Sequence, residues 1–167
     1  MATITFKGIP VNVLGNFVQP EMKAPDFTLI KGDLTDFHPA DYKGKYLLLN
    51  IFPSLDTGVC ATSVRKFNKL ASEMPNTTVL AISKDLPFAQ GRFCTTEGIE
   101  NVVALSDYKY TSDFGLKYGV LMENGPIAGL LARAVVVIDP KGKIVYSELV
   151  PEIAQEPNYE AALKAIR

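Results

Sequence analysis

Apolar runs of two different kinds alternate along the chain. Tyr46–Phe52 and Thr78–Ser83 are almost continuously apolar over the length of a strand, which is typical of central strands buried on both faces. Between them, Ala61–Met74 places its apolar residues at helical spacing and most of its charged residues off that face. The order strand, helix, strand predicts a β-α-β unit built on a buried sheet.

The remaining segments extend this alternation. We expect Asp85 to cap a second helix, with Pro87 in its first turn and Gly98 at its end. The other expected helices are Ser112–Tyr118, ended by Gly119, and Pro157–Ile166. The other expected strands are Thr3–Phe6, Val11–Leu14, Phe27–Ile30, Val102–Leu105, Ala132–Ile138 and Lys143–Leu149.

Two turn sequences indicate hairpins. Lys7–Pro10 separates the first two strands, and Asp139–Gly142 separates the last two. The pattern as a whole predicts an α/β fold, in which a central mixed β-sheet is flanked by helices on both faces and an N-terminal β-hairpin is added.

Length and composition limit the function classes. A chain of 167 residues predicts a single domain over 1–167, with residues 1–16 as the hairpin extension. Seventeen Lys and Arg against eighteen Asp and Glu give a net charge of −1, which disfavours nucleic-acid and membrane-surface partners. No apolar run reaches the roughly 18–20 residues that span a bilayer. The first residues lack a signal-peptide pattern, so we expect a cytoplasmic protein.

The most informative stretch connects the first buried strand to the following helix. Cys60 is expected in the first turn of that helix, where free backbone N–H groups and the positive end of the helix dipole favour a thiolate. Thr57 would stand at or just before the cap, and Pro53 would end strand pairing and shield the sulfur from solvent. The competing interpretation makes Cys60 a small buried apolar residue.

Other cysteine chemistries fit this sequence poorly. Two cysteines and one histidine cannot complete a structural zinc site without a carboxylate, so no metal is expected. A phosphatase loop needs an arginine six residues after the cysteine, but that place holds Lys66, and Arg65 stands one position early. A Cys–His hydrolase would depend on His38, which lies in a loop-like stretch beside a proline.

The spacing P-x-x-x-T-x-x-C, formed by Pro53, Thr57 and Cys60, resembles the active-site signature of the peroxiredoxins. The stretches NIFPSLDTGVCATSVRKFN, SKDLPFAQGRFC and GLLARAVVVID extend the likeness to the thiol peroxidase branch, an atypical two-cysteine group. The resemblance covers nearly the whole chain. It implies a thioredoxin-like fold with an added N-terminal hairpin, a homodimer and a reaction that needs no cofactor.

The resemblance also implies a role for each residue. Cys60 matches the peroxidatic cysteine, which reduces hydrogen peroxide or an organic hydroperoxide and becomes a sulfenic acid. Thr57 and Arg133 match the residues that hold and polarise the peroxide, and Pro53 matches the shielding proline. Cys94 matches the resolving cysteine, which forms an intramolecular disulfide with Cys60 that thioredoxin reduces. A non-enzymatic redox sensor that uses the same two cysteines is the alternative function.

The positions of the two cysteines imply movement. If Cys60 opens one helix and Cys94 ends another, their Cα atoms are expected to lie beyond the roughly 7 Å that a disulfide can bridge. We therefore expect one of the two helical segments to rearrange or unwind when the disulfide forms. Gly91 is a weak point in the second helix.

Overall fold

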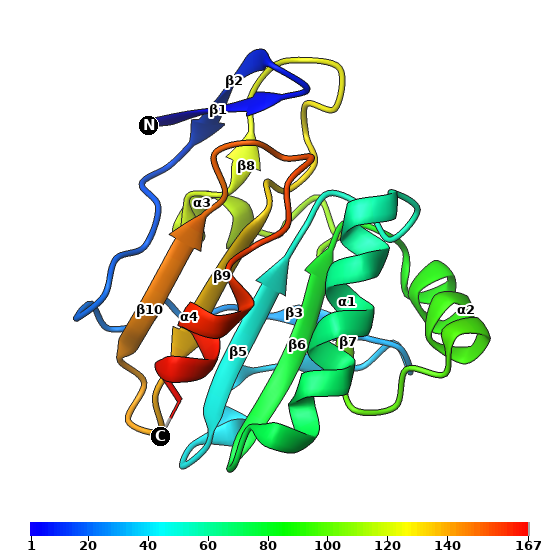
Figure 1. Ribbon diagram of the computed structural model, residues 1–167, viewed down its shortest axis with the longest axis vertical. Helices are drawn as coiled ribbons and strands as arrows, with labels where there is room; N and C mark the ends of the chain where they lie inside the picture. The colour runs from blue at the N-terminus through cyan, green and yellow to red at the C-terminus, as the bar shows by residue number, and fades with distance from the viewer. Residues whose placement is uncertain (167) are drawn as a thin grey trace.

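A mixed β-sheet forms the centre of the computed structural model, which describes residues 1–166 (Figure 1). The strands are β1 (Ala2–Phe6), β2 (Ile9–Leu14), β3 (Leu29–Lys31), β4 (Asp36–Phe37), β5 (Tyr46–Ile51), β6 (Thr77–Ser83), β7 (Val103–Ser106), β8 (Leu121–Met122), β9 (Ala134–Ile138) and β10 (Ile144–Leu149). The helices are α1 (Gly58–Leu70), α2 (Pro87–Glu97), α3 (Phe114–Tyr118) and α4 (Tyr159–Lys164), with short 3-10 turns at Pro39–Tyr42 and Ala71–Glu73.

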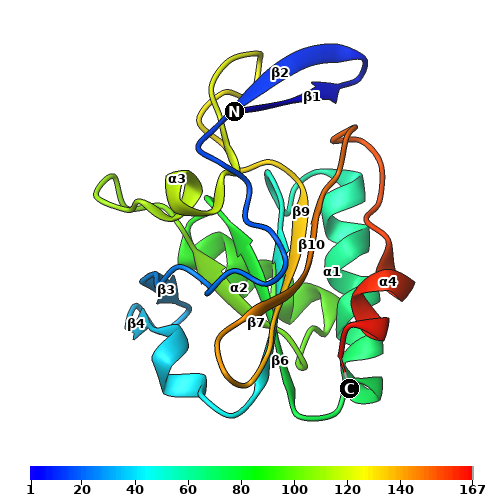
Figure 2. The same cartoon turned by 90° about the vertical axis from the view of Figure 1, so that its left-hand side faces the viewer.

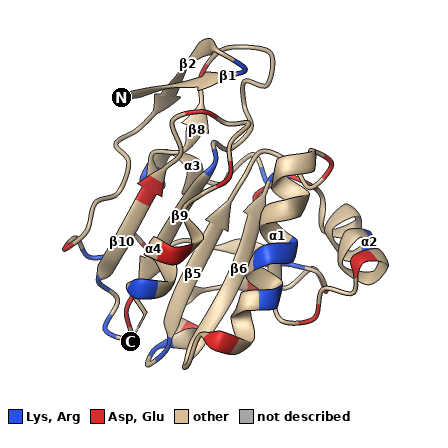
Figure 3. Cartoon of the chain, in the orientation of Figure 1, with Lys and Arg blue, Asp and Glu red and all other residues tan. Residues whose placement is uncertain are grey.

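The central sheet has the strand order β10-β9-β5-β6-β7-β3-β4. Strands β5, β6 and β7 run parallel, and the other neighbouring pairs are antiparallel. The predicted central strands therefore lie in the middle of a mixed sheet, as their continuous apolar sequences require. Their residues are uncharged, whereas the charges in Figure 3 lie mainly on helices and loops.

Helices cover both faces of the sheet, which confirms the predicted fold class. In Figure 2, α1 and α4 lie on one side of the strands and α3 lies on the other. Phe67 of α1 and Ala162 of α4 pack against Leu48, while Phe114 and Tyr118 of α3 belong to the core on the opposite face. Helix α2 packs beside β7 (Figure 1).

The N-terminal hairpin forms a second, three-stranded sheet in the order β1-β2-β8. Its turn contains two residues, Lys7 and Gly8, rather than the four expected, because both adopt positive φ (51° and 83°) and close a tight hairpin. Glu152 anchors this turn by accepting hydrogen bonds from the Lys7 and Gly8 N–H groups and from the Thr5 hydroxyl. Strand β8 is too short to leave a periodic signal, so the sequence did not predict it.

Several element boundaries differ from the expected ones. Helix α2 is capped by Leu86, not Asp85, although it ends at Gly98 as predicted. Helix α4 begins after Asn158, whose side chain accepts the Ala161 N–H, so the helix is shorter than Pro157–Ile166. Helix α3 likewise begins at Phe114 rather than Ser112, because the Ser112 N–H closes a turn onto the Lys109 carbonyl and Asp113 has a non-helical backbone.

Strand β9 begins at Ala134 rather than Ala132 because the two preceding residues bond outside the sheet ladder. The Ala132 N–H donates to the carbonyl of Val120, and the Arg133 carbonyl accepts from Val150. Over residues 1–166, none of the helices combines the length and the apolar character needed to cross a membrane.

Candidate active site

Cys60 lies at the N-terminal end of α1, directly after the carboxyl end of β5. Thr57 is the N-cap residue, and its hydroxyl oxygen accepts the Cys60 N–H at 3.4 Å. The same hydroxyl donates to the Ser54 carbonyl at 3.2 Å. Cys60 is therefore the third residue of the helix, within the turn where backbone N–H groups and the helix dipole favour an anion. Its side chain is fully buried.

Arg133 brings a positive charge to this sulfur. Its Nη2 lies 3.1 Å from Cys60 Sγ, and its Nε donates to the Ile153 carbonyl at 2.7 Å. The residue is only 1% exposed. Over the described residues 1–166, its Nη1 has no hydrogen-bond partner. A buried guanidinium is costly unless it is paired, so this contact favours the anionic form of the Cys60 sulfur.

A pocket of about 360 Å³ opens beside these groups. Pro53, Thr57 and Arg133 line it, and Ser54 adds a further polar side chain. The rest of its lining is mostly apolar and comes from distant parts of the chain: Phe6, Lys7, Gly58, Val59, Ile127, Leu130, Ile153 and Ala154. The N-terminal hairpin thus contributes to the wall through Phe6 and Lys7, which no sequence motif indicated.

Cys94 lies in α2, outside this pocket lining. Its side chain is half-buried, and this burial raises the pKa of the Cys94 thiol. It packs against the apolar cluster that includes Cys60, Phe52 and Val64. Both cysteines are free thiols in the structure. The two sulfurs therefore have different surroundings, with a cation beside Cys60 and apolar groups beside Cys94.

The alternative cysteine chemistries find no support in the geometry. His38 places its Nδ1 3.1 Å from the Thr28 hydroxyl and does not line the pocket beside Cys60. Arg65 forms an ion pair with Glu97 of α2, and the Lys66 ammonium lies over the Tyr159 ring. The three basic side chains therefore point to partners other than the sulfur.

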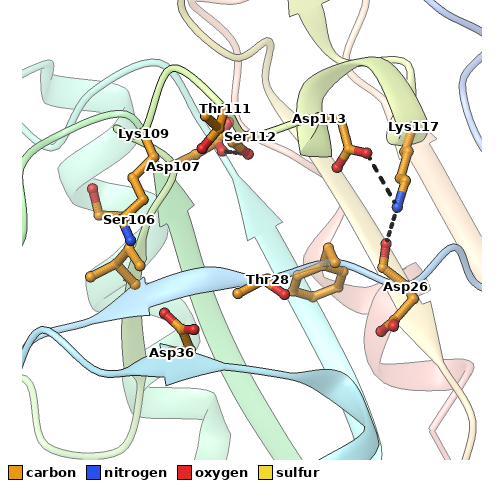
Figure 4. A pocket seen from close by; sticks show the side chains of 12 residues that line it. Asp26, Thr28, Asp36, Ser106, Asp107, Lys109, Thr111, Ser112, Asp113 and Lys117 are labelled. Carbon is orange, nitrogen blue, oxygen red and sulfur yellow. Dashed lines mark hydrogen bonds and ion pairs between the residues drawn. The ribbon is translucent and has the colours of Figure 1, made fainter.

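A second, more polar pocket of about 270 Å³ lies between β3 and the segment that follows β7 (Figure 4). Its charged groups largely satisfy one another. Asp107 accepts from the Ser112 hydroxyl and pairs with Lys84, and Lys117 pairs with Asp113 and donates to the Asp26 carbonyl. Burial raises the pKa of Asp107, with these contacts opposing the shift. Its lining includes none of Pro53, Thr57 and Arg133, which line the other pocket, and Arg133 contacts the Cys60 sulfur there.

Within residues 1–166, no three side chains of His, Cys, Asp and Glu gather closely enough to hold a metal ion.

Comparison with known proteins identifies the family. The family model described as Redoxin matches residues 19–163. The chain belongs to the redoxin family. The thiol peroxidase of Mycobacterium tuberculosis is 55% identical over 166 residues, which cover 99% of both chains. The thiol peroxidase of Corynebacterium glutamicum is 51% identical over the same length and the same share of each chain.

Solved structures of redoxin relatives agree with this assignment. A peroxiredoxin-like protein from Aquifex aeolicus has a TM-score of 0.91 and 42% sequence identity, covering 99% of this chain and 96% of its own. A thiol peroxidase from Chromobacterium violaceum has a TM-score of 0.90 at 21% identity, covering 98% of this chain and 95% of its own, and supports the fold. The predicted thioredoxin-like fold and the resemblance to the thiol peroxidase branch are confirmed. The chain is a peroxiredoxin and has peroxidase activity.

Proposed function

We propose that Cys60 of this peroxidase reduces hydrogen peroxide and organic hydroperoxides and that Cys94 completes the cycle through an intramolecular disulfide. The observation that carries the proposal is the 3.1 Å contact between Arg133 Nη2 and Cys60 Sγ at the N-terminus of α1. A guanidinium and free helix N–H groups both stabilise a thiolate, which is the reactive form of cysteine.

In the first step, the Cys60 thiolate attacks one oxygen of the hydroperoxide. A sulfur–oxygen bond forms, the O–O bond breaks, and the second oxygen leaves with the electron pair and takes up a proton to become water or an alcohol. Cys60 is oxidised to a sulfenic acid. Arg133 Nη1 is available to donate a hydrogen bond to the leaving oxygen because it has no partner within residues 1–166.

Thr57 supports the same step from the other side of the pocket. Its hydroxyl donates to the Ser54 carbonyl at 3.2 Å, a long hydrogen bond for two oxygens. We propose that the hydroxyl rotates to donate to the bound peroxide while its oxygen still accepts the Cys60 N–H. Pro53, buried beside them, excludes water from the sulfur. The apolar walls, including Leu130 and Ile127, support binding of the alkyl part of an organic hydroperoxide.

In the second step, the Cys94 thiol attacks the Cys60 sulfenic acid, a disulfide forms, and water leaves. A dithiol reductant then exchanges with this disulfide, restores both thiols and becomes a disulfide itself. The likeness to thiol peroxidases supports thioredoxin as that reductant. The same likeness supports our predictions of a homodimer, a cytoplasmic location and one domain over 1–167.

Titration of free thiols during a single turnover tests this proposal. One equivalent of hydrogen peroxide should remove both thiols of the reduced wild type and leave a monomeric disulfide. Cys94→Ser should stop at a trappable sulfenic acid, and Cys60→Ser should barely react. Survival of both wild-type thiols would refute the proposal. Adding thioredoxin and its reductase then separates an enzyme, which turns over, from a redox sensor, which would cycle only with its target protein.

A further inference from the structure

Asp85 lies at the end of β6, where sequence reasoning expects a helix cap, but its carboxylate serves another segment. Oδ1 accepts the Ser54 hydroxyl at 2.8 Å. Oδ2 accepts the Leu55 N–H at 2.8 Å and the Ser83 hydroxyl at 2.6 Å. Helix α2 begins instead after Leu86, which provides no side-chain cap. The carboxylate therefore leaves its own helix uncapped and holds the loop that leads to Cys60.

This loop transmits the position of Asp85 to the reactive sulfur. The Ser54 carbonyl accepts both the N–H and the hydroxyl of Thr57, each at 3.2 Å. The Thr57 oxygen in turn accepts the Cys60 N–H. Hydrogen bonds through Ser54 and Thr57 therefore connect the Asp85 carboxylate to the first turn of α1, where a thiolate would be stabilised.

Asp85 is itself firmly fixed by the sheet. The Ser106 hydroxyl, at the end of β7, donates to the Asp85 carbonyl at 2.5 Å. Ser83, the last residue of β6, accepts from the buried Gln90 side chain of α2 at 3.2 Å. Asp85 is therefore held by the last residues of β6 and β7, and α2 in turn holds Ser83. The carboxylate is thus a rigid support rather than a mobile surface group.

We propose that Asp85 is a positioning residue for Cys60, holding the turn Ser54–Thr57 so that the N-terminus of α1 and Arg133 both meet the sulfur. The inference rests on the proposed function in one respect, since it takes Cys60 as the thiol that reacts with peroxide. Two hydrogen bonds from the turn to one carboxylate, which the Ser83 hydroxyl also holds in place, constrain the turn more than a single cap does. Loss of the carboxylate should therefore loosen the thiolate site through the turn, although Asp85 itself does not line the substrate pocket.

The test measures the first chemical step alone. In a Cys94→Ser background, the rate constant for sulfenic acid formation with hydrogen peroxide is measured by rapid mixing and trapping, for Asp85→Ala and Asp85→Asn. The matched control is Asp139→Ala. The Asp139 carboxylate likewise holds a turn, since it accepts the N–H groups of Lys141 and Lys143, but this turn follows the far end of β9.

We expect Asp85→Ala to slow the step at pH 7 by about tenfold, the effect of losing one to two cap-sized interactions at the thiolate. Asp85→Asn should lie between Asp85→Ala and the parent, because the amide oxygen still accepts at one of the two carboxylate positions. Asp139→Ala should react at the parent rate, even if its unfolding midpoint in urea falls as far as that of Asp85→Ala.

A pH profile separates positioning from general destabilisation. If the loss comes from weaker stabilisation of the thiolate, the deficit of Asp85→Ala shrinks as pH rises, because hydroxide then supplies the thiolate without help from the helix. Should Asp85→Ala fail to fold, Asp85→Asn carries the same comparison. Folded Asp85 variants that react like the control, or a deficit that stays constant with pH, would overturn the inference. A Cys94→Ser parent that itself fails to react would instead refute the proposed function.

Discussion

Gly91 occupies the middle of α2, the helix that carries Cys94, and its backbone is exposed. A methyl group added at this position would meet no atom within 4 Å, and its φ angle is not in the positive region. The change Gly91→Ala therefore adds no clash. In the interior of a helix, alanine is more favourable than glycine by about 1 kcal/mol, so the substitution should stabilise α2 by that amount.

This stabilisation should slow one step of the reaction. The Cys94 carbonyl accepts the N–H groups of Gly98 and Ile99, which close the end of α2. Cys94 therefore stays fixed in the helix while this end of α2 is intact. If α2 unwinds before the disulfide forms, about 1 kcal/mol of added helix stability lowers the population of the unwound form roughly fivefold. Disulfide formation should then slow by up to that factor, whereas sulfenic acid formation should keep its rate.

Quenched-flow kinetics with one equivalent of hydrogen peroxide resolves the two steps. Trapped sulfenic acid reports the first step, and the loss of the second thiol reports the second. Gly32→Ala is the matched control, because an added methyl group at Gly32 also meets open space but lies in the turn after β3. Amide hydrogen exchange confirms that α2 has been stabilised. Slower exchange in α2 together with an unchanged rate of disulfide formation would refute the requirement for unwinding.

Three further predictions concern the active site and the hairpin contact. Arg133→Met should slow oxidation of Cys60 about tenfold to a hundredfold, the value of a charge-assisted hydrogen bond. The free energy of unfolding should stay equal or rise, because the substitution removes the desolvation cost of a buried guanidinium whose Nη1 has no partner within residues 1–166. Peroxide kinetics and urea unfolding measure the two effects, and parallel losses would contradict this. Thr57→Val removes the acceptor for the Cys60 N–H, so urea unfolding should show a loss of about 1 kcal/mol. Hydrogen bonds from the N–H groups of Ala154 and the hairpin turn lower the pKa of Glu152 to about 2 from 4.5. Because the folded-state pKa is the lower one, this carboxylate stabilises the fold above about pH 4.5 and loses its effect as pH falls to about 2, so the urea midpoints of wild type and Glu152→Gln should converge over that interval; a constant separation would contradict it.

The strong periodic patterns predicted the frame of the fold correctly. Strands β5 and β6 and helix α1 follow directly from their apolar spacing, and Gly98 ends α2 in the left-handed conformation, as expected. Local signals of this kind depend only on neighbouring residues. They therefore predict the folded structure correctly wherever tertiary contacts do not compete with them.

Asp85 illustrates why other features of the fold and the site were not predicted from the sequence. Its sequence context, just before a proline and a helical segment, is typical of an N-cap. In the fold, however, the active-site loop approaches from about thirty residues away in the chain and offers two donors to the carboxylate, the Ser54 hydroxyl and the Leu55 N–H, so tertiary contacts replace the local role. The same reason applies to Phe6. No local pattern indicates that a hairpin at the start of the chain reaches the pocket beside Arg133.

The two cysteines differ in the way that the proposed cycle needs. Cys60 is held against a buried guanidinium at a helix N-terminus, an environment of the kind that stabilises a thiolate, which is why the proposed cycle begins there. Burial among apolar groups raises the pKa of Cys94 and keeps it a thiol, which protects it from direct oxidation. The same burial makes Cys94 a poor nucleophile in place. In the proposed cycle it would become effective when α2 opens and exposes it, so that one rearrangement would both bring the sulfurs together and activate the second of them.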